Sequence, residues 1–318
     1  MKKTKKSQAL TTKTKSSGLK SIFRKWQLYL LTLPAVIYTI LFNYKPMYGI
    51  LIAFKKYKIK LGVWDSPWAG EFGLDNFKRL FDSYWFPVIL ENTFVINGLN
   101  ILLTFPLPII LALMVNEVRN SRIRKGFQII SYAPHFISTV IVCSMVVMFT
   151  APETGILNLI TIALGGTPTN VMYDPGAFKW VYIISGIWQT TGWGSIIYYA
   201  TLSSVDPALH EAAEIDGANR LQRIWHINIP ALIPTIVIML IMRFGQVMNV
   251  GYEKVYLLQN NINLLGSEVI STYVYKVGLE NAEYAFSTAA GLFNSVVNCT
   301  FLVVVNKICD KLSGSSLF

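Results

Sequence analysis

The stretch HEAAEIDGANRLQRIWHINIPALIP, at 210–234, lies between two strongly apolar segments but is itself polar and rich in alanine. Asp206 and Pro207 precede it as a favoured N-cap and first helical residue, because aspartate accepts a free backbone N–H and proline has none to lose. Gly217 can adopt the left-handed conformation that ends a helix. The pattern therefore predicts a short helix over 207–216.

This predicted helix has an unusually small apolar face. At 3.6 residues per turn, one face collects Ala208, Leu209, Ala212, Ala213 and Ile215, and the other collects His210, Glu211 and Glu214. A face made mainly of alanine buries little area but lets another surface approach the backbone closely, which favours a groove on a partner protein. The alternative is a helix lying on lipid head groups, although such helices usually carry bulky Leu, Phe or Trp. A second short helix is expected from Ala218, ending before Pro230 and Pro234.

The segments around this stretch indicate an all-α membrane protein. The 318 residues are 53% hydrophobic and only 14% charged, whereas soluble domains are about a quarter charged. Runs of about 18 or more apolar residues can cross a bilayer, and a helix leaves no backbone group unpaired there. We expect six spans, at 26–44, 88–115, 127–150, 180–203, 230–250 and 285–306. The transmembrane domain then covers 26–312, with a basic cytoplasmic tail at 1–25, a cytoplasmic loop at 204–229 and a C-terminal tail at 313–318.

The net charge of +11 comes mainly from basic residues that flank these spans. Seventeen of the 28 lysines and arginines fall in segments that share one side of the membrane with the N-terminus. The run FKKYKIK at 54–60 opposes this bias. The positive-inside rule predicts that both termini are cytoplasmic, in a multi-pass protein of the plasma membrane whose basic residues contact anionic lipid. Nucleic acid is not an expected partner, because the aromatic–basic platforms that bind single strands are absent.

Catalytic and metal-binding patterns are not found in the sequence. His210 and Glu211 begin like a zinc-protease motif, but Glu214 stands where the second histidine ligand would be. The sequence contains neither a Gly-x-Ser-x-Gly nucleophile elbow nor a Gly-x4-Gly-Lys-Ser/Thr phosphate loop. The three cysteines do not have metal-ligand spacing. We therefore expect no catalytic residue, no metal site and no cofactor bound by this chain.

The segment EAAEIDGANRLQRIWHINIP at 211–230 resembles the EAA loop of binding-protein-dependent ABC importer permeases. The positions that match the pattern of that loop are Glu211, Ala212, Ala213, Asp216, Gly217, Ala218 and Pro230. Ile224 departs from the pattern, since the family commonly has Phe there, and Trp225 follows it. The likeness extends over most of the chain, through ENTF at 91–94 and GIWQTTGWGSIIYYATLSSVDPALHEAA at 186–213. It is closest to carbohydrate-type permeases of the LplB-like subgroup, which import oligosaccharides.

The resemblance implies a type I importer permease with the MetI-like fold. In that family the EAA helix docks in a cleft of a cytoplasmic ATPase and transmits its closure to the spans. The partners implied are an ABC ATPase dimer, which holds ATP and Mg²⁺, a second homologous permease, and an extracytoplasmic solute-binding protein or lipoprotein. ATP hydrolysis would take place on the ATPase, so this subunit is not expected to be an enzyme. Coupling requires two packings of the spans, each stabilised by one of the partners.

Polar side chains within the predicted spans mark a candidate substrate path, because such residues are costly in lipid and usually face an interior or a cavity. In span five, Arg243, Gln246 and Asn249 would share one side of a helix. Spans four and six add Trp188, Gln189, Thr190, Thr191, Trp193, Asn294 and Asn298. Amide groups suit sugar hydroxyls, and aromatic faces suit sugar rings. The alternative for each residue is helix–helix packing, and Arg243 can instead pair with backbone carbonyls or with a carboxylate on the partner permease.

Three other functions stay open from the sequence. The same machinery could import a peptide or an amino acid. A membrane enzyme acting on lipid-linked sugars would need acidic or histidine pairs at a membrane face, which the sequence does not display. An autonomous channel is the third alternative. The sequence also leaves open which saccharide is carried, how long it is and whether it is acidic.

Overall fold

The computed structural model describes residues 26–314, 316 and 317. The described residues divide into two compact units, with the boundary between Leu51 and Ile52. The predicted basic tail at 1–25 and residues 315 and 318 of the predicted C-terminal tail lie outside the described residues.

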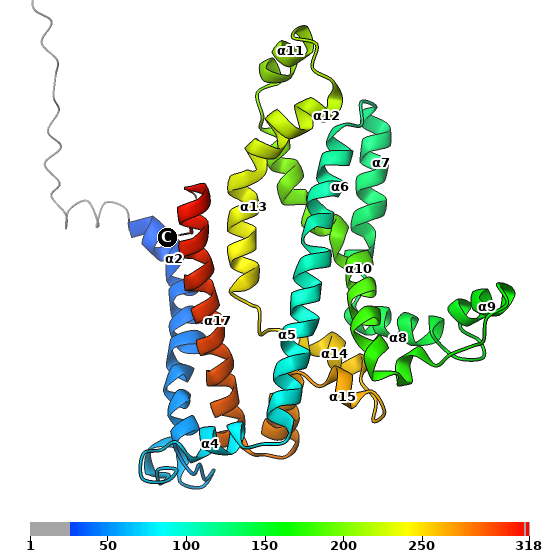
Figure 1. Cartoon of the computed structure of the whole chain (residues 1–318). Coiled ribbons are helices and arrows are strands. Elements are labelled where there is room, and N and C mark those ends of the chain that lie inside the picture. The colour runs from blue at the N-terminus through cyan, green and yellow to red at the C-terminus, as the bar shows by residue number, and fades with distance from the viewer. Residues whose placement is uncertain (1–25, 315, 318) are drawn as a thin grey trace, which may run out of the picture. The chain divides into compact units, whose positions relative to one another are not determined.

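All regular secondary structure in the described residues is helical, as predicted. The longer helices are α2 (Trp26–Thr39), α5 (Trp85–Thr104), α6 (Pro106–Asn116), α7 (Ser121–Tyr132), α8 (Thr139–Phe149), α10 (Pro175–Ser203), α13 (Ile229–Phe244) and α17 (Tyr284–Ser313) (Figure 1). The shorter helices are α3 (Gly62–Asp65), α4 (Asp75–Phe81), α9 (Ile156–Ala163), α11 (Pro207–Ile215), α12 (Arg220–Arg223), α14 (Tyr252–Leu258), α15 (Leu264–Ser267) and α16 (Ile270–Tyr275). Short 3-10 or π-helical segments are η1 (Ile40–Tyr44), η2 (Lys45–Phe54), η3 (Ala133–Phe136), η4 (Val171–Tyr173), η5 (Ile224–Asn228) and η6 (Lys276–Glu280).

Helices occupy all six predicted spans. Four segments are long and apolar enough to cross a membrane: Trp26–Phe54, Trp85–Asn116, Arg220–Phe244 and Tyr284–Leu312. A fifth candidate is the bent pair Ser121–Phe136 and Thr139–Phe149. The fourth predicted span coincides with α10, which is 29 residues long but less apolar, because tryptophan, glycine and hydroxyl residues interrupt its aliphatic positions. The predicted N-in/C-in topology and domain boundaries stay predictions.

The third span was predicted as one helix over 127–150, and the structure shows that this is wrong. Its two parts are bent by 93°. The α-helix gives way to η3, where Pro134 has no N–H for the helical ladder. Ile137 is then extended, and the Ser138 hydroxyl accepts a hydrogen bond from the Ile141 N–H at 3.4 Å, which begins α8. Hydropathy over this segment could not reveal the bend because both parts are apolar.

The fifth span differs from prediction at both ends. No break precedes Pro230, because α12, η5 and α13 form one helix from Arg220 to Phe244. In η5 the Ile229 N–H bonds to the Ile224 carbonyl, and this wider π-type turn accommodates the proline that follows. The other end comes at Phe244 rather than 250.

Because α13 ends early, the polar residues predicted to share one side of span five do not lie on one helix. Gly245 follows the helix, and a Cβ there would press on Leu302 of α17. The chain then continues in turns, with Asn249 N–H bonded to the Gln246 carbonyl at 2.9 Å. Arg243, Gln246 and Asn249 are all exposed, but they do not share one side of a helix.

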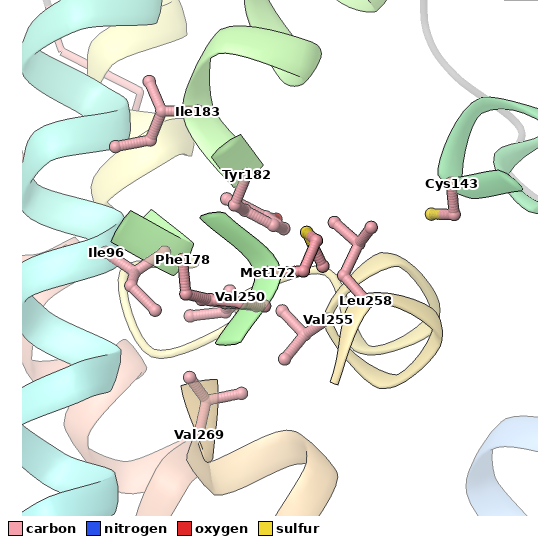
Figure 2. Close-up of a cluster of buried hydrophobic side chains, with 10 residues drawn as sticks. All are labelled: Ile96, Cys143, Met172, Phe178, Tyr182, Ile183, Val250, Val255, Leu258 and Val269. Atoms are coloured by element: carbon pink, nitrogen blue, oxygen red, sulfur yellow. The ribbon is translucent and has the colours of Figure 1, made fainter. Parts of the chain in front are cut away.

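The principal apolar core of the second unit forms where α10 meets the short helices that follow α13 (Figure 2). Phe178, Tyr182 and Ile183 of α10 pack with Val255 and Leu258 of α14. Ile96 of α5, Cys143 of α8, Met172, Val250 and Val269 complete the cluster. This core joins residues from α5, α8, α10 and α14, which are far apart in sequence, so it determines how the long helices are spaced.

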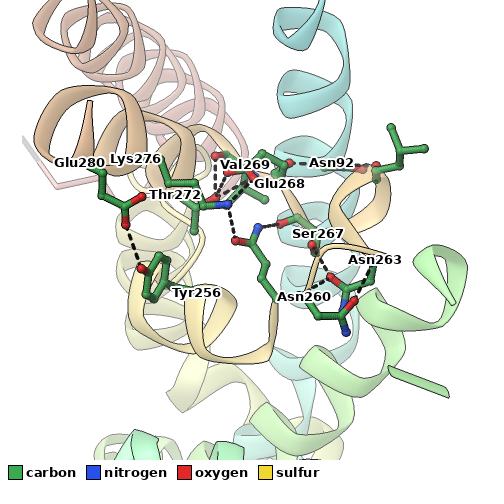
Figure 3. A network of polar contacts seen from close by, with 12 residues as sticks. Asn92, Tyr256, Asn260, Asn263, Ser267, Glu268, Val269, Thr272, Lys276 and Glu280 are labelled. Carbon is green, nitrogen blue, oxygen red and sulfur yellow. Dashed lines mark hydrogen bonds and ion pairs between the residues drawn. The ribbon is translucent and has the colours of Figure 1, made fainter. Parts of the chain in front are cut away.

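The segment between α13 and α17 is a folded substructure held by polar contacts (Figure 3). The buried Glu268 carboxylate accepts hydrogen bonds from Lys276 at 2.6 Å and from Thr272 at 2.8 Å. Asn92 of α5 donates to the carbonyls of Leu265 and Glu268 at 2.9 and 3.0 Å. Because buried polar groups are costly without partners, these bonds anchor α15 and α16 firmly to α5.

Gly192 allows α10 to approach α7 closely, and alanine there is expected to destabilise the protein. Its Cβ would overlap the backbone carbonyl of Ser131, and overpacking of this kind costs about 1–3 kcal/mol. We expect the melting temperature of the Gly192→Ala variant in detergent to fall by at least about 2 °C. The matched control is Gly98→Ala in α5, where the added Cβ meets open space and alanine favours the helix. Equal melting temperatures for the two variants would contradict the close approach.

Candidate coupling helix and substrate path

The predicted polar helix is present as α11. It projects from the end of the helix bundle of the second unit, in the connection between α10 and α13 (Figure 1). The Asp206 carboxylate accepts a hydrogen bond from the Ala208 N–H at 2.9 Å, so the predicted N-cap forms. At the other end Gly217 has φ +78°, and the Ala218 N–H bonds to the Ala213 carbonyl at 2.9 Å. This is the glycine-ended helix stop that the sequence predicted.

A second set of local contacts fixes α12 against α11. Asn219 and Gln222 form a reciprocal capping box, with bonds of 2.7 and 2.9 Å between each side chain and the other's backbone N–H. Arg223 forms an ion pair with Glu214 of α11. A cavity of about 310 Å³ lies between the two helices. The loop is therefore a preformed two-helix unit, which we call the coupling loop (residues 206–228).

The described residues leave α11 of the coupling loop uncovered. No residue of α11 is buried, and large apolar side chains around its alanines are open to solvent: Leu209, Ile215, Leu221 and Trp225. Ile215 is 87% exposed. Clustered exposed apolar side chains mark an interaction surface. Sequence reasoning identified the alanine face but missed Leu221, whose single apolar position in a polar run gave no periodic signal.

Six of the seven predicted coupling residues lie together in 211–218, on α11 and the turn after it. Pro230 does not belong to this cluster. It lies in the continuous helix that leads from α12 into α13 and is exposed. Its position makes it part of the connection between the coupling loop and the span.

Three asparagines predicted near the substrate path come together from two elements. Asn294 and Asn298 of α17 both donate to Asn249 Oδ1, at 2.9 and 3.3 Å. Asn298 also accepts from the Met248 N–H at 2.9 Å, so it holds the turn after α13 in place. Asn294 Oδ1 is buried and has no hydrogen-bond partner among the described residues. The cluster thus retains one amide oxygen whose hydrogen-bonding capacity is unused among the described residues.

The α10 candidates lie in separate surroundings rather than in one site. Gln189 is buried and donates to the Ile137 carbonyl, in the break between α7 and α8, at 3.2 Å, which favours its packing role. Trp193 stacks on His135 with ring centroids 4.5 Å apart. Trp188 lines an apolar cavity of about 490 Å³ between α8 and α10. Both tryptophans are about half exposed, at 48% and 46%.

A group of three tyrosines from α14 and α16 was not assigned to the path by the sequence reasoning. The ring centroids of Tyr252 and Tyr275 are 4.7 Å apart, and Tyr256 lies 5.5 Å from Tyr252. Tyr256 donates to Glu280 at 2.9 Å, and this hydrogen bond raises the pKa of the tyrosine hydroxyl. Tyr252 and Tyr275 line a cavity of about 390 Å³, and hydroxyl-bearing residues of α16 and α17 also line it. The four-residue spacing of Tyr252 and Tyr256 was the available signal.

Comparison with known proteins identifies the family. The model of the family described as “Binding-protein-dependent transport system inner membrane component” matches residues 104–312. The chain belongs to this family. It is therefore a multi-pass membrane permease of the ABC importer class, as its resemblance predicted.

Similar proteins extend the match over nearly the whole chain. The chain is 41% identical over 294 residues to Protein LplB of Bacillus subtilis (strain 168), covering 92% of this chain and 91% of that protein. It is 40% identical over 306 residues to the polygalacturonan/rhamnogalacturonan transport system permease protein YteP of the same organism, covering 96% and 94%. A chain in the crystal structure of a bacterial alginate ABC transporter, in complex with alginate pentasaccharide-bound periplasmic protein, superposes with a TM-score of 0.86 at 39% identity, covering 95% of this permease and 100% of that chain. The predicted type I permease fold is confirmed.

Removing the N-cap of α11 is expected to loosen the coupling loop without unfolding the permease. Loss of a side-chain N-cap costs about 0.5–2 kcal/mol, and α11 has no buried contacts to compensate. We expect Asp206→Ala to accelerate hydrogen exchange of α11 amides by about 2- to 30-fold. Asp206→Asn, which retains a capping oxygen, should exchange like the wild type. Identical exchange in the alanine variant would show that the cap does not hold the helix.

Proposed function

We propose that this permease is one of two permease subunits of an ABC importer that moves oligosaccharides across the plasma membrane. YteP and the alginate transporter are named for saccharide polymers, which supports this substrate class over peptides and amino acids. The coupling part of the proposal rests on α11. This helix has no buried residue, its apolar face is made mainly of alanine, and it lies in the chain between the long helices α10 and α13.

Coupling follows from how the loop is joined to the core. The coupling loop contacts a groove of the ATPase dimer, which binds ATP and Mg²⁺ and carries out hydrolysis. On one side, α12 continues without a break into α13. On the other, only three residues separate α10 from α11. Tyr198 and Leu202 of α10 pack with Leu232 of α13, so a displacement of the loop moves the ends of both helices together.

The substrate path runs past the asparagine cluster and the tyrosine group. A solute-binding protein delivers the oligosaccharide from outside the cell, and the second permease supplies the other wall of the path. Asn294 Oδ1 accepts a hydrogen bond from a sugar hydroxyl, and the faces of Tyr252 and Tyr275 suit the C–H face of a sugar ring. Arg243 and Gln246, exposed at the end of α13, extend this polar wall toward the coupling loop.

Blocking the alanine face is expected to uncouple transport. In cells that carry the complete importer, Ala212→Trp should reduce oligosaccharide uptake to near background, because the bulky ring prevents close approach of the ATPase groove. Co-purification of the ATPase should fall with it. The matched control is Ala163→Trp, which places the same side chain at an exposed position of α9 and should retain uptake. Normal uptake and assembly in the Ala212→Trp importer would overturn the coupling proposal.

Removing the Asn294 side chain, whose amide oxygen has no hydrogen-bond partner among the described residues, is expected to weaken substrate passage while the complex still assembles. A neutral hydrogen bond contributes about 0.5–1.5 kcal/mol, so uptake by Asn294→Ala at low substrate should fall about 2- to 10-fold. Ser295→Ala is the control, because Ser295 is exposed and its hydroxyl donates to the Gly291 carbonyl of its own helix. Equal uptake by the two variants would place the path elsewhere.

A further inference from the structure

The turn η5 connects the coupling loop to α13 and contains a weakened stretch of the helical ladder. In η5 the Ile229 N–H bonds to the Ile224 carbonyl, five residues back, so the turn is wider than an α-helical one. Pro230 and Pro234 follow, and neither has an N–H to contribute. The helix is therefore continuous, but it lacks two ladder bonds just where it leaves the coupling loop, and helices bend most readily at such places.

The segments on either side of η5 are each held by contacts of their own. The coupling loop is held by its caps and by the ion pair between Arg223 and Glu214. In α13, Leu232 packs in a buried cluster with residues of α6 and α10, and the hydroxyl of Thr235 lies 3.1 Å from that of Thr201. A movement of the loop relative to the span is therefore concentrated in η5.

Asn228, the last residue of η5, is buried with both polar atoms of its amide unpaired. Its exposed fraction is 0%, and neither Oδ1 nor Nδ2 has a hydrogen-bond partner among the described residues. By contrast, the buried amides of Asn97, Asn158 and Asn263 all donate to backbone carbonyls. A buried amide without partners is costly, so Asn228 is unfavourably placed in this packing of the helices.

Asn228 lies on the side of its helix that faces two neighbouring spans. It precedes Leu232 by one helical turn, so the two residues share one side. Leu232 packs with Ala112 and Leu202, which belong to the last turns of α6 and α10. The last carbonyls of a helix lack partners within that helix, so the ends of α6 and α10 offer acceptors to an amide that moves toward them.

We propose that Asn228 is a positioning residue for coupling, and that η5 is the hinge on which the coupling loop turns. In the packing of this structure the amide is unpaired, and in the second packing of the spans it bonds at the ends of α6 and α10. The unpaired amide disfavours the first packing and the bonded amide favours the second, which brings the two closer in free energy. The inference rests on the proposed function, because it assigns the residue through which the ATPase acts on α13.

Removing the amide is expected to stabilise the permease and to slow transport at the same time. Asn228→Leu keeps a γ-branched side chain but has no polar atom to leave unpaired, so its melting temperature in detergent should rise by at least about 2 °C. The same change removes the bonds of the second packing, so uptake by cells carrying the complete importer should fall about fivefold or more. Co-purification of the ATPase should stay at the wild-type level.

A pair of isosteric variants separates hydrogen bonding from side-chain shape. Asn228→Thr retains a hydroxyl that donates and accepts, whereas Asn228→Val has the same shape without it. Uptake by Asn228→Thr should exceed uptake by Asn228→Val about 2- to 10-fold, and Asn228→Val should melt no lower than Asn228→Thr. Asn158→Leu is the control for a bonded amide, because Asn158 pairs with backbone groups of Ala151 and Thr169, and it should melt lower than the wild type.

The hinge is tested separately by hydrogen exchange of the complete importer with and without a non-hydrolysable ATP analogue. The analogue should change the exchange rates of amides in 224–229 by about twofold or more, whereas those of 236–244, in the held part of α13, should stay the same. Unchanged exchange in 224–229 would overturn the hinge.

Other outcomes contradict the inference and leave the proposed importer intact. A lower melting temperature of Asn228→Leu would show that the amide already has partners in this packing. A higher melting temperature with unchanged uptake, or equal uptake by Asn228→Thr and Asn228→Val, would show that the amide takes no part in coupling. Loss of the ATPase from the purified variants would assign Asn228 to assembly. No oligosaccharide uptake by the wild type, or no ATPase bound to it, would instead remove the proposed function.

Discussion

The hydrogen bonds at the two ends of α11 are the constraint on which the shape of the coupling loop depends. A nine-residue helix is marginal in water, and no buried side chain supports this one. Asp206 satisfies a free N–H at the start, and Gly217 turns the chain back at the end. Arg223 then binds Glu214 and joins the next helix to it. The loop keeps its shape locally, which leaves its alanine face uncovered for another protein.

The same loop is continuous with the core. The helix from Arg220 to Phe244 continues past Pro230 without a break, because the wider π-type turn of η5 accommodates the proline. At its far end the chain turns at Gly245, where the asparagine cluster binds it to α17. Beyond that turn, the polar network around Glu268 anchors the following helices to α5. A movement imposed on the coupling loop therefore reaches a turn whose polar groups line the proposed path.

Sequence patterns located the helices well and their interruptions poorly. Hydropathy detects that a segment is apolar but does not detect its direction, so the bend at Pro134 and the end of α13 at Phe244 were missed. The predicted stop before Pro230 was wrong for the opposite reason: proline signals a break, but a wider helical turn can accommodate it. The prediction that Arg243, Gln246 and Asn249 share one side of a helix was wrong because α13 ends at Phe244, before two of the three residues.

The sequence by itself determined what local chemistry decides: the caps of α11, its alanine face, the apolar segments and the family. These features depend on residues that are close in the chain, so short sequence patterns are enough to predict them. Only the tertiary structure decided which distant groups meet. Asn294 of α17 donates to Asn249 in the turn after α13, and the Lys254 ammonium lies over the ring of Tyr182 on α10. Such pairings depend on how helices pack against one another, and no local spacing encodes that packing.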